Sequence, residues 1–201
     1  MRYSLVIFDM DGTLTVELID FPAIRSEIGV PAGGGILEYI AALAPADQAR
    51  AQIILHRHEM AAAQSCRLHE GAVETLAALR GLGVKTAILT RNSPECARTV
   101  LGRHGLASGW DHISTRDDLP HKPHADSILR ITHKLEVPIR HTLMVGDYLY
   151  DVQAARNAGC DSALLCEAGE LPAFADIATY RIGGLMELLT IVQDGEKCEN
   201  Q

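Results

Sequence analysis

The feature that most constrains the fold of this chain is the segment 9–14, Asp-Met-Asp-Gly-Thr-Leu, which directly follows an apolar run at residues 5–8 (Leu-Val-Ile-Phe). A short hydrophobic run that stops at acids and a glycine is typical of a parallel strand buried on both faces. Open α/β sheets bind their ligands at the carboxyl ends of such strands. Asp9 and Asp11 would therefore lie together at that edge, where a cation or a shared proton would relieve their repulsion.

The composition narrows the class of protein. The chain has 201 residues, enough for one core domain with an elaboration or for two small domains. It is 47% hydrophobic and 22% charged, which is typical of a globular protein. A formal net charge of -8 gives no general attraction for nucleic acid, so an anionic substrate must meet local cations.

Localisation and cysteine chemistry follow from what the sequence lacks. The sequence has no apolar run near the ~18 residues that a membrane span needs, and the first predicted strand leaves no room for a signal peptide. We therefore expect a cytoplasmic protein without a membrane partner.

The five cysteines are odd in number and have no CxxC spacing, which argues against a disulfide framework and a zinc site. The sequence does not indicate an oligomeric state.

From about residue 71, helical and strand patterns alternate with short connections. This alternation predicts a Rossmann-like α/β fold, in which a parallel sheet is covered by helices on both faces in three layers. The predicted strands, after the first, are 84–89, 111–114, 142–145, 162–165 and 180–182, and the predicted helices are 72–80, 94–104, 125–135, 151–157 and 185–192.

The segment 16–68 breaks the alternation. It has three helical stretches, at 21–28, 36–43 and 46–64, separated by glycines and prolines. Because this insert follows the acidic loop of the first strand, we expect it to lie over that loop as a small all-helical cap. We therefore predict a catalytic core of residues 1–15 and 69–201 and a cap of residues 16–68.

Three further polar motifs follow predicted strands of the core. They are Thr90-Arg91-Asn92, His121-Lys122-Pro123, and the segment 146–151, Gly-Asp-Tyr-Leu-Tyr-Asp. Because parallel strands end at one edge, these motifs and the segment 9–14 should converge. The converging set is Asp9, Asp11, Thr90, Lys122, Asp147 and Asp151.

Four carboxylates in one place would repel each other by about 4 kcal/mol per close pair at an effective dielectric near 20. A hard divalent cation such as Mg²⁺ relieves this repulsion, since it prefers carboxylates, water and phosphate oxygens. The ammonium group of Lys122 and the hydroxyl of Thr90 suit the charge that spreads over a transferring phosphoryl group. The residues therefore favour Mg²⁺-dependent phosphoryl transfer, with one carboxylate as nucleophile and a second as general acid and base.

In order and spacing, these four motifs resemble the haloacid dehalogenase (HAD) superfamily, and the position of the insert resembles the phosphoglycolate phosphatase type. The resemblance implies a first strand at the centre of the sheet, flanked by the strands of the second and fourth motifs. It implies Asp9 as nucleophile, Asp11 as general acid and base, and Thr90 and Lys122 as ligands of the phosphoryl oxygens. Magnesium would be held by Asp9, Asp147 and the backbone carbonyl of Asp11, with Asp151 holding a metal-bound water or orienting Lys122.

The predicted activity is hydrolysis of a small phosphorylated metabolite through an aspartyl-phosphate. A phosphomutase of the β-phosphoglucomutase type and a catalytically silent protein that binds a phospho-ligand remain alternatives. Substrate contacts are expected from Gly12, Thr13, Arg91 and Asn92. For Arg91 an ion pair with nearby acids is an equal alternative, and this residue departs from the family pattern, which often has Asn directly after the threonine. The polar residues of the cap and its hinge, whose roles the sequence leaves open, are Arg25, His56, Arg57, His58, Glu59, Arg67 and His69. His56 and His58 do not share a helix face and so cannot chelate a metal together. A solvated helix face is therefore favoured for the segment 56–59, with one of its members reaching the substrate as a further alternative.

Overall fold

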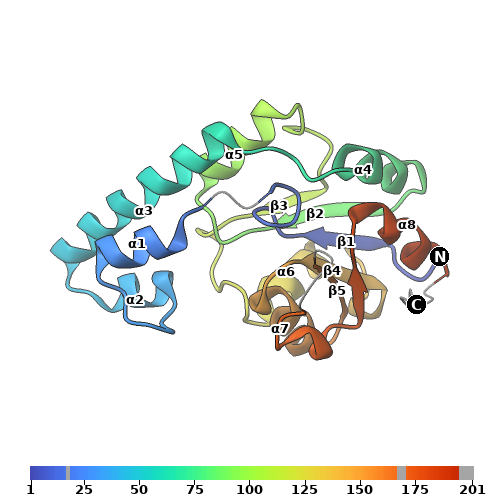
Figure 1. Cartoon of the computed structure of the whole chain (residues 1–201). Helices are drawn as coiled ribbons and strands as arrows, with labels where there is room; N and C mark the ends of the chain where they lie inside the picture. Colours follow the sequence, from blue (N-terminus) through green and yellow to red (C-terminus); the bar gives the residue numbers. More distant parts are fainter. Residues whose placement is uncertain (17–18, 167–170, 195–201) are drawn as a thin grey trace.

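The computed structural model describes residues 1–16, 19–166 and 171–194. Its described residues form one parallel six-stranded sheet in the order β3-β2-β1-β4-β5-β6 (Figure 1). The strand predicted to be central lies between the strands of the second and fourth motifs, which confirms the predicted order and the α/β fold class. The strands are β1 (Leu5–Phe8), β2 (Lys85–Leu89), β3 (His112–Ser114), β4 (Thr142–Gly146), β5 (Asp161–Leu165) and β6 (Tyr180–Ile182).

Helices cover both faces of the sheet, as the alternation predicted. Along β1, Leu5 and Ile7 pack on the face of α6 and α7, whereas Val6 and Phe8 pack on the face of α4 and α8. This division follows from the period of two along a strand. The helices of the core are α4 (Ala72–Gly81), α5 (Pro94–Arg103), α6 (Asp126–Lys134), α7 (Leu149–Ala158) and α8 (Leu188–Asp194), with short 3₁₀ turns η1 (Ile139–His141), η2 (Ala175–Ile177) and η3 (Leu185–Glu187).

Local signals explain where these helices begin and end. The hydroxyl of Ser93 accepts a hydrogen bond from the Cys96 amide at 3.2 Å and so caps α5, and Pro94 occupies its first turn. Gly159 ends α7 with a left-handed φ of 79°, a conformation that glycine adopts without strain. The expected helix 151–157 begins earlier, at Leu149, so that Asp151 lies inside its first turn.

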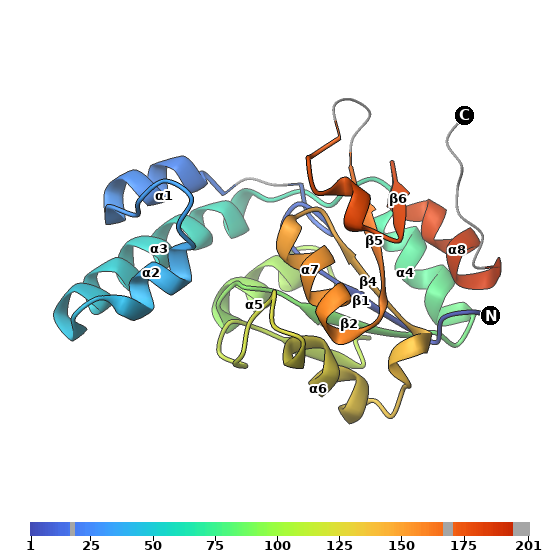
Figure 2. The same ribbon diagram turned by 90° about the horizontal axis from the view of Figure 1, so that it is seen from below.

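The segment between β1 and α4 folds into three helices, α1 (Phe21–Ile28), α2 (Ile36–Ala42) and α3 (Pro45–Ser65). Their apolar faces share a small core of their own around Ile24, Ile40 and Leu55. Figure 2 shows this helical insert projecting beyond the end of the sheet, with the C-terminal part of α3 beside α5. The predicted helices are confirmed; α3 begins one residue early because Pro45 needs no amide partner in a first turn.

Two chain segments connect the insert to the core and pair with each other. The Val16 amide donates to the Arg67 carbonyl and the His69 amide to the Leu14 carbonyl, both at 2.9 Å, and Thr15 forms an antiparallel bridge with Leu68. We propose this crossing as the boundary between a core of residues 1–15 and 69–201 and a cap of residues 16–68.

None of the helices in the part of the chain that the structure describes is both long and apolar enough to cross a bilayer. Cys66, Cys96, Cys160 and Cys166 are free thiols, and Cys198 lies outside the described residues.

Candidate active site

A cavity of about 460 Å³ lies between the carboxyl edge of the sheet and the helical insert. Every site residue predicted from the sequence lines it except Gly12 and Thr13, which lie directly behind the carboxylate of Asp147. The predicted convergence of the four motifs is therefore found in the structure. The residues of the core that line the cavity are Asp9, Asp11, Thr90, Arg91, Asn92, Lys122, Asp147, Tyr148, Tyr150 and Asp151.

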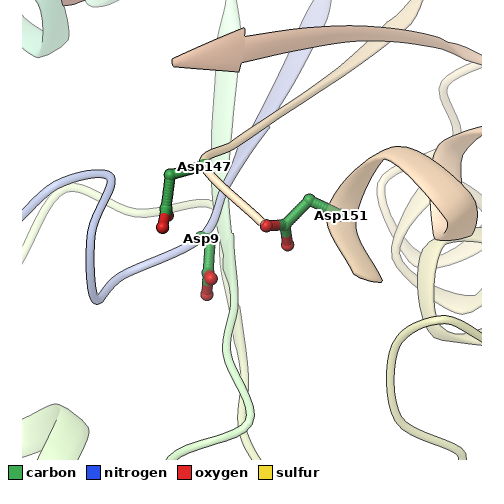
Figure 3. A group of neighbouring side chains, drawn as sticks. All are labelled: Asp9, Asp147 and Asp151. Atoms are coloured by element: carbon green, nitrogen blue, oxygen red, sulfur yellow. The ribbon is translucent and has the colours of Figure 1, made fainter. Parts of the chain in front are cut away.

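Three carboxylates form the centre of this site. Asp9 follows β1, Asp147 follows β4, and Asp151 lies in the first turn of α7 (Figure 3). One oxygen from each lies within 4.8 Å of the others. Because β1 and β4 are neighbours in register, their ends place these acids side by side.

The buried ammonium group of Lys122 joins two of the acids. Its Nζ lies 2.8 Å from Oδ1 of Asp9 and 2.6 Å from Oδ1 of Asp151, and the side chain is only 2% exposed. Burial lowers the pKa of Lys122, but the charges of Asp151 and Asp9 outweigh it, so the net shift is upward and the group stays charged. The second oxygen of Asp151 accepts the Tyr148 amide at 3.0 Å. Each oxygen of Asp151 thus accepts a hydrogen bond, one from Lys122 and one from the backbone.

Asp147 is held by the loop that follows β1. Oγ1 of Thr13 donates to its Oδ1 at 2.6 Å. Gly12 has φ +78°, and a β-carbon there would overlap the carboxylate of Asp147, so this position requires glycine on both counts. Burial, followed by the charges of Asp9 and Asp151, raises the pKa of Asp147 to about 8. Ionisation of Asp147 is therefore disfavoured next to the charges of Asp9 and Asp151.

Asp11 differs from the other acids in its partners. The amide Nδ2 of Asn92 donates to its Oδ2, and Oγ1 of Thr15 donates to its Oδ1 over a long 3.4 Å. Burial, followed by the charge of Asp9, raises the pKa of Asp11 to about 7, although the bond from Asn92 opposes the shift. A carboxyl with a pKa near neutrality can both give and take a proton, which suits a general acid and base.

The donor set fits a divalent cation. Carboxylate oxygens of Asp9 and Asp147 converge, and within the described ranges Oδ2 of Asp147 has no hydrogen-bond partner from the protein. Hard divalent cations bind through such oxygens. A bound cation would also lower the raised pKa of Asp147, since it stabilises the charged carboxylate.

The second motif contributes a buried hydroxyl and a cation. Thr90 is 4% exposed, and its Oγ1 accepts the Asn92 amide at 3.1 Å. Arg91 donates to both oxygens of Glu38 on α2, at 2.7 and 3.0 Å, and to the backbone carbonyl of Lys122 at 2.5 Å. Its guanidinium also lies 4.6 Å from the ring centroid of Tyr150. Arg91 therefore links the insert to the core, and its role in substrate binding stays a prediction.

Sequence reasoning missed a second arginine–glutamate link. Glu59 on α3 is 3% exposed, and its Oε1 accepts from Arg116, which follows β3, at 2.5 Å. Its Oε2 is buried without a hydrogen-bond partner in the described structure, and burial raises the pKa of Glu59 although Arg116 opposes the shift. The helical period could have found this residue, because Glu59 follows the buried Leu55 by four positions.

Residues 56–58 of the insert contact glutamates outside the acid cluster. His56 is within 3.6 Å of Glu95, while Arg57 and His58 both contact Glu27, at 2.5 and 3.0 Å. The prediction of a solvated helix face is thus confirmed for the exposed Arg57 and is wrong for Glu59, because Glu59 lies on the side of α3 that packs toward the core. Arg67 is exposed at the hinge, and Arg25 lines the cavity.

A parallel α/β sheet with a cluster of acids and a buried lysine at its carboxyl edge defines a hydrolytic enzyme of the phosphoryl-transfer type. The model of the haloacid dehalogenase-like hydrolase family matches residues 3–159, and the chain belongs to this family.

Similar proteins support this assignment. An uncharacterized hydrolase from Saccharomyces cerevisiae is 30% identical over 96% of this chain and 92% of its own length. A phosphoglycolate phosphatase from Chromobacterium violaceum is 27% identical over 94% of this chain and 96% of its own. The crystal structure of a hydrolase from Pseudomonas syringae has the same fold, with a TM-score of 0.78 and 22% identity over 93% and 96% of the two chains. The expectation of an enzyme of the hydrolase class is confirmed.

Proposed function

We propose that this protein hydrolyses a small phosphate monoester through an aspartyl-phosphate on Asp9. The observation that carries the proposal is the place of the Asp9 carboxylate, 15% exposed at the cavity and held through Oδ1 by the buried Lys122. A carboxylate fixed at one oxygen presents the other to an incoming phosphorus atom. The phosphatase names among the relatives are consistent with this reaction.

In the first step, an oxygen of Asp9 bonds to phosphorus while the bond from phosphorus to the leaving oxygen breaks. Asp11 gives its proton to the leaving oxygen, which departs as a hydroxyl group of the product. Because Asn92 occupies Oδ2 of Asp11, we assign this proton to Oδ1, whose only described hydrogen bond is the long one from Thr15.

In the second step, water attacks phosphorus, its proton returns to Asp11, and the bond between Asp9 and phosphorus breaks to release phosphate. Lys122 and the hydroxyl of Thr90 would bind the phosphoryl oxygens through both steps. Gly12, Thr13 and Asn92 shape this end of the cavity, the first two by holding Asp147 and the third by holding Asp11.

We propose Mg²⁺ as the cofactor, held by Asp9, Asp147 and the backbone carbonyl of Asp11. When bound, it would neutralise charge on the phosphoryl oxygens and on the acids. Asp151 would orient Lys122, whose Nζ donates to its Oδ1 at 2.6 Å.

Hydrolysis of 4-nitrophenyl phosphate with Mg²⁺ tests the proposal. We expect activity that EDTA abolishes and that Asp9→Asn lowers by at least about a thousandfold, since it removes the nucleophile. Asp117→Asn, an exposed acid in the loop after β3, serves as the charge-matched control and should behave as the wild type. Retained activity in Asp9→Asn would contradict the proposed nucleophile.

The two alternatives give different results. A phosphomutase would convert a sugar phosphate into its isomer in excess over free phosphate. A silent binding protein would bind phosphate esters without turnover of any of them. We expect free phosphate as the product.

A further inference from the structure

The helical insert forms the wall of the cavity that faces the acid cluster, and this wall is mostly apolar. In the proposed reaction the core residues hold the phosphoryl group, so the insert would contact the leaving group of the substrate. The insert residues in this wall are Phe21, Pro22 and Arg25 of α1, Gly35, Ile36 and Leu37 at the start of α2, and Leu55 and Glu59 of α3.

Three cations line the cavity, and two of them are neutralised by acids of the protein. Lys122 pairs with Asp9 and Asp151, and Arg91 pairs with Glu38. Arg25 is different: in the described part of the chain it has no acidic partner. Its Nη1 donates to the backbone carbonyl of Gly34 at 2.6 Å, a bond that fixes the side chain but leaves its charge uncompensated.

The glycine turn 33–35 accounts for this difference between the arginines. The carbonyl of Gly34 holds Arg25 beside the cavity. A β-carbon on Gly35 would overlap the carboxylate of Glu38, so glycine leaves room for the acid that neutralises Arg91. The same short turn therefore leaves room for the acid that neutralises Arg91 and holds Arg25 without neutralising it.

We propose that Arg25 determines specificity by binding a second anionic group, a carboxylate or a phosphate, on the leaving group of the substrate. This inference rests on the proposed function for the place of the leaving group. The forked donors of a guanidinium match both groups. The cation matters here because the chain carries a net charge of -8 and the cavity contains an acid cluster, both of which repel an additional anion. Aliphatic carbons of the leaving group would contact Ile36 and Leu37.

Three substrates on one three-carbon skeleton test the proposal with the Mg²⁺-loaded wild type. They are 3-hydroxypropyl phosphate, which has a neutral end, 3-(phosphooxy)propanoate and propane-1,3-diyl bisphosphate. We expect kcat/KM at least tenfold higher for one or both anionic substrates than for the neutral one. The better of the two identifies the second group as a carboxylate or as a phosphate. Equal values for all three would overturn the proposal.

Variants assign this preference to Arg25. Arg25→Gln should lower kcat/KM for the preferred anionic substrate at least tenfold more than for the neutral one, mainly through KM, and Arg25→Lys should restore part of the ratio. Arg50→Gln makes the same charge change at an exposed position of α3 and should leave the ratio at the wild-type value. An equal loss on all substrates in Arg25→Gln would show a structural role and overturn the proposal.

A binding measurement separates this inference from the proposed chemistry. In the Asp9→Asn background with Mg²⁺, calorimetry with the same three compounds reports affinity without turnover. Tighter binding of an anionic compound that Arg25→Gln abolishes would support the role of Arg25 even if the wild type hydrolysed nothing, a result that would contradict only the proposed function. Equal affinities with and without Arg25 would overturn the inference whether or not the protein is a phosphatase.

Discussion

The ammonium nitrogen of Lys122 lies 2.8 Å from Oδ1 of Asp9, so the proposed nucleophile is fixed by a side chain that is only 2% exposed. The same nitrogen lies 2.6 Å from Asp151, whose other oxygen is held by the Tyr148 amide at the start of α7. The position of Asp9 thus depends on the first turn of a helix as well as on its own strand.

Replacing Lys122 tests this arrangement. Lys122→Met should lower kcat by at least about a hundredfold, because it removes a preorganised charge from the phosphoryl site. It should also destabilise the fold, since two acids lose their buried partner. Phosphatase assays and urea unfolding measure the two effects. Lys85→Met is the matched control, because Lys85 donates to a carbonyl, that of Leu135, at the other end of the sheet.

The double variant Lys122→Met/Asp151→Asn separates stability from catalysis. Because it removes one acid together with the lysine, it should recover part of the lost stability and none of the activity. Recovery of activity in the double variant would show that Lys122 acts only on the fold.

A second prediction concerns the metal. Thr13→Val removes the hydrogen bond to Asp147 with little change in volume, and such partners of metal ligands are worth about tenfold or more in affinity. We expect the Mg²⁺ concentration for half-maximal activity to rise about tenfold while kcat at saturating Mg²⁺ changes much less. Thr75→Val, a buried threonine of α4, should leave the Mg²⁺ dependence unchanged. An unchanged dependence in Thr13→Val would mean that Asp147 needs no orientation to bind the metal.

The fold and the converging acids were predictable from sequence because both follow from local rules. Apolar runs end at polar motifs, and parallel strands bring those ends together, so Asp9, Lys122 and Asp147 could be placed without knowing any contact between them. The helix ends were similarly marked, by Ser93 and Gly159 for example.

The contacts between insert and core could not be predicted in the same way. Arg91 pairs with Glu38, which lies 53 positions away on a helix whose orientation is set by tertiary packing. The sequence favours a solvated face for Glu59, since charged residues are mostly exposed, but packing against α5 and Arg116 buries this side chain. The role of the turn 33–35 depends on the same packing, since its glycines alone indicate only a flexible connection.

The raised pKa of Asp11 predicts a pH dependence of stability in the metal-free protein. An unfolded aspartate has a pKa of about 3.9, whereas the folded value is about 7. Between these values the folded state holds a proton that the unfolded state has lost, so a rise in pH destabilises the fold, and the loss is complete above about pH 7. Asparagine does not titrate, so the free energy of unfolding of Asp11→Asn relative to wild type should increase between pH 5 and pH 8.

Urea unfolding in EDTA across this range measures that difference. Asp117→Asn changes an exposed acid, and its difference from wild type should stay nearly constant with pH. A constant difference for Asp11→Asn as well would show that the Asp11 carboxyl is charged throughout, which would leave no proton for the leaving oxygen in the proposed first step.

The two links between insert and core should differ in energy because they differ in burial. Glu59 is 3% exposed, so removing Arg116 leaves a buried charge without a partner, which costs about 3 kcal/mol. The Glu38 side chain is 54% exposed, and water replaces much of its interaction with Arg91, so this pair should contribute about 1 kcal/mol or less.

Double-mutant cycles in urea unfolding measure the coupling energy of each pair. One cycle uses Arg116→Met and Glu59→Gln, and the other uses Arg91→Met and Glu38→Gln. Each cycle isolates the interaction within its pair from the other contacts of the two residues. A coupling energy for the Arg91–Glu38 pair as large as that of the Arg116–Glu59 pair would mean that burial does not set the strength of these links. The insert would then be held over the acids mainly by the exposed link beside the cavity.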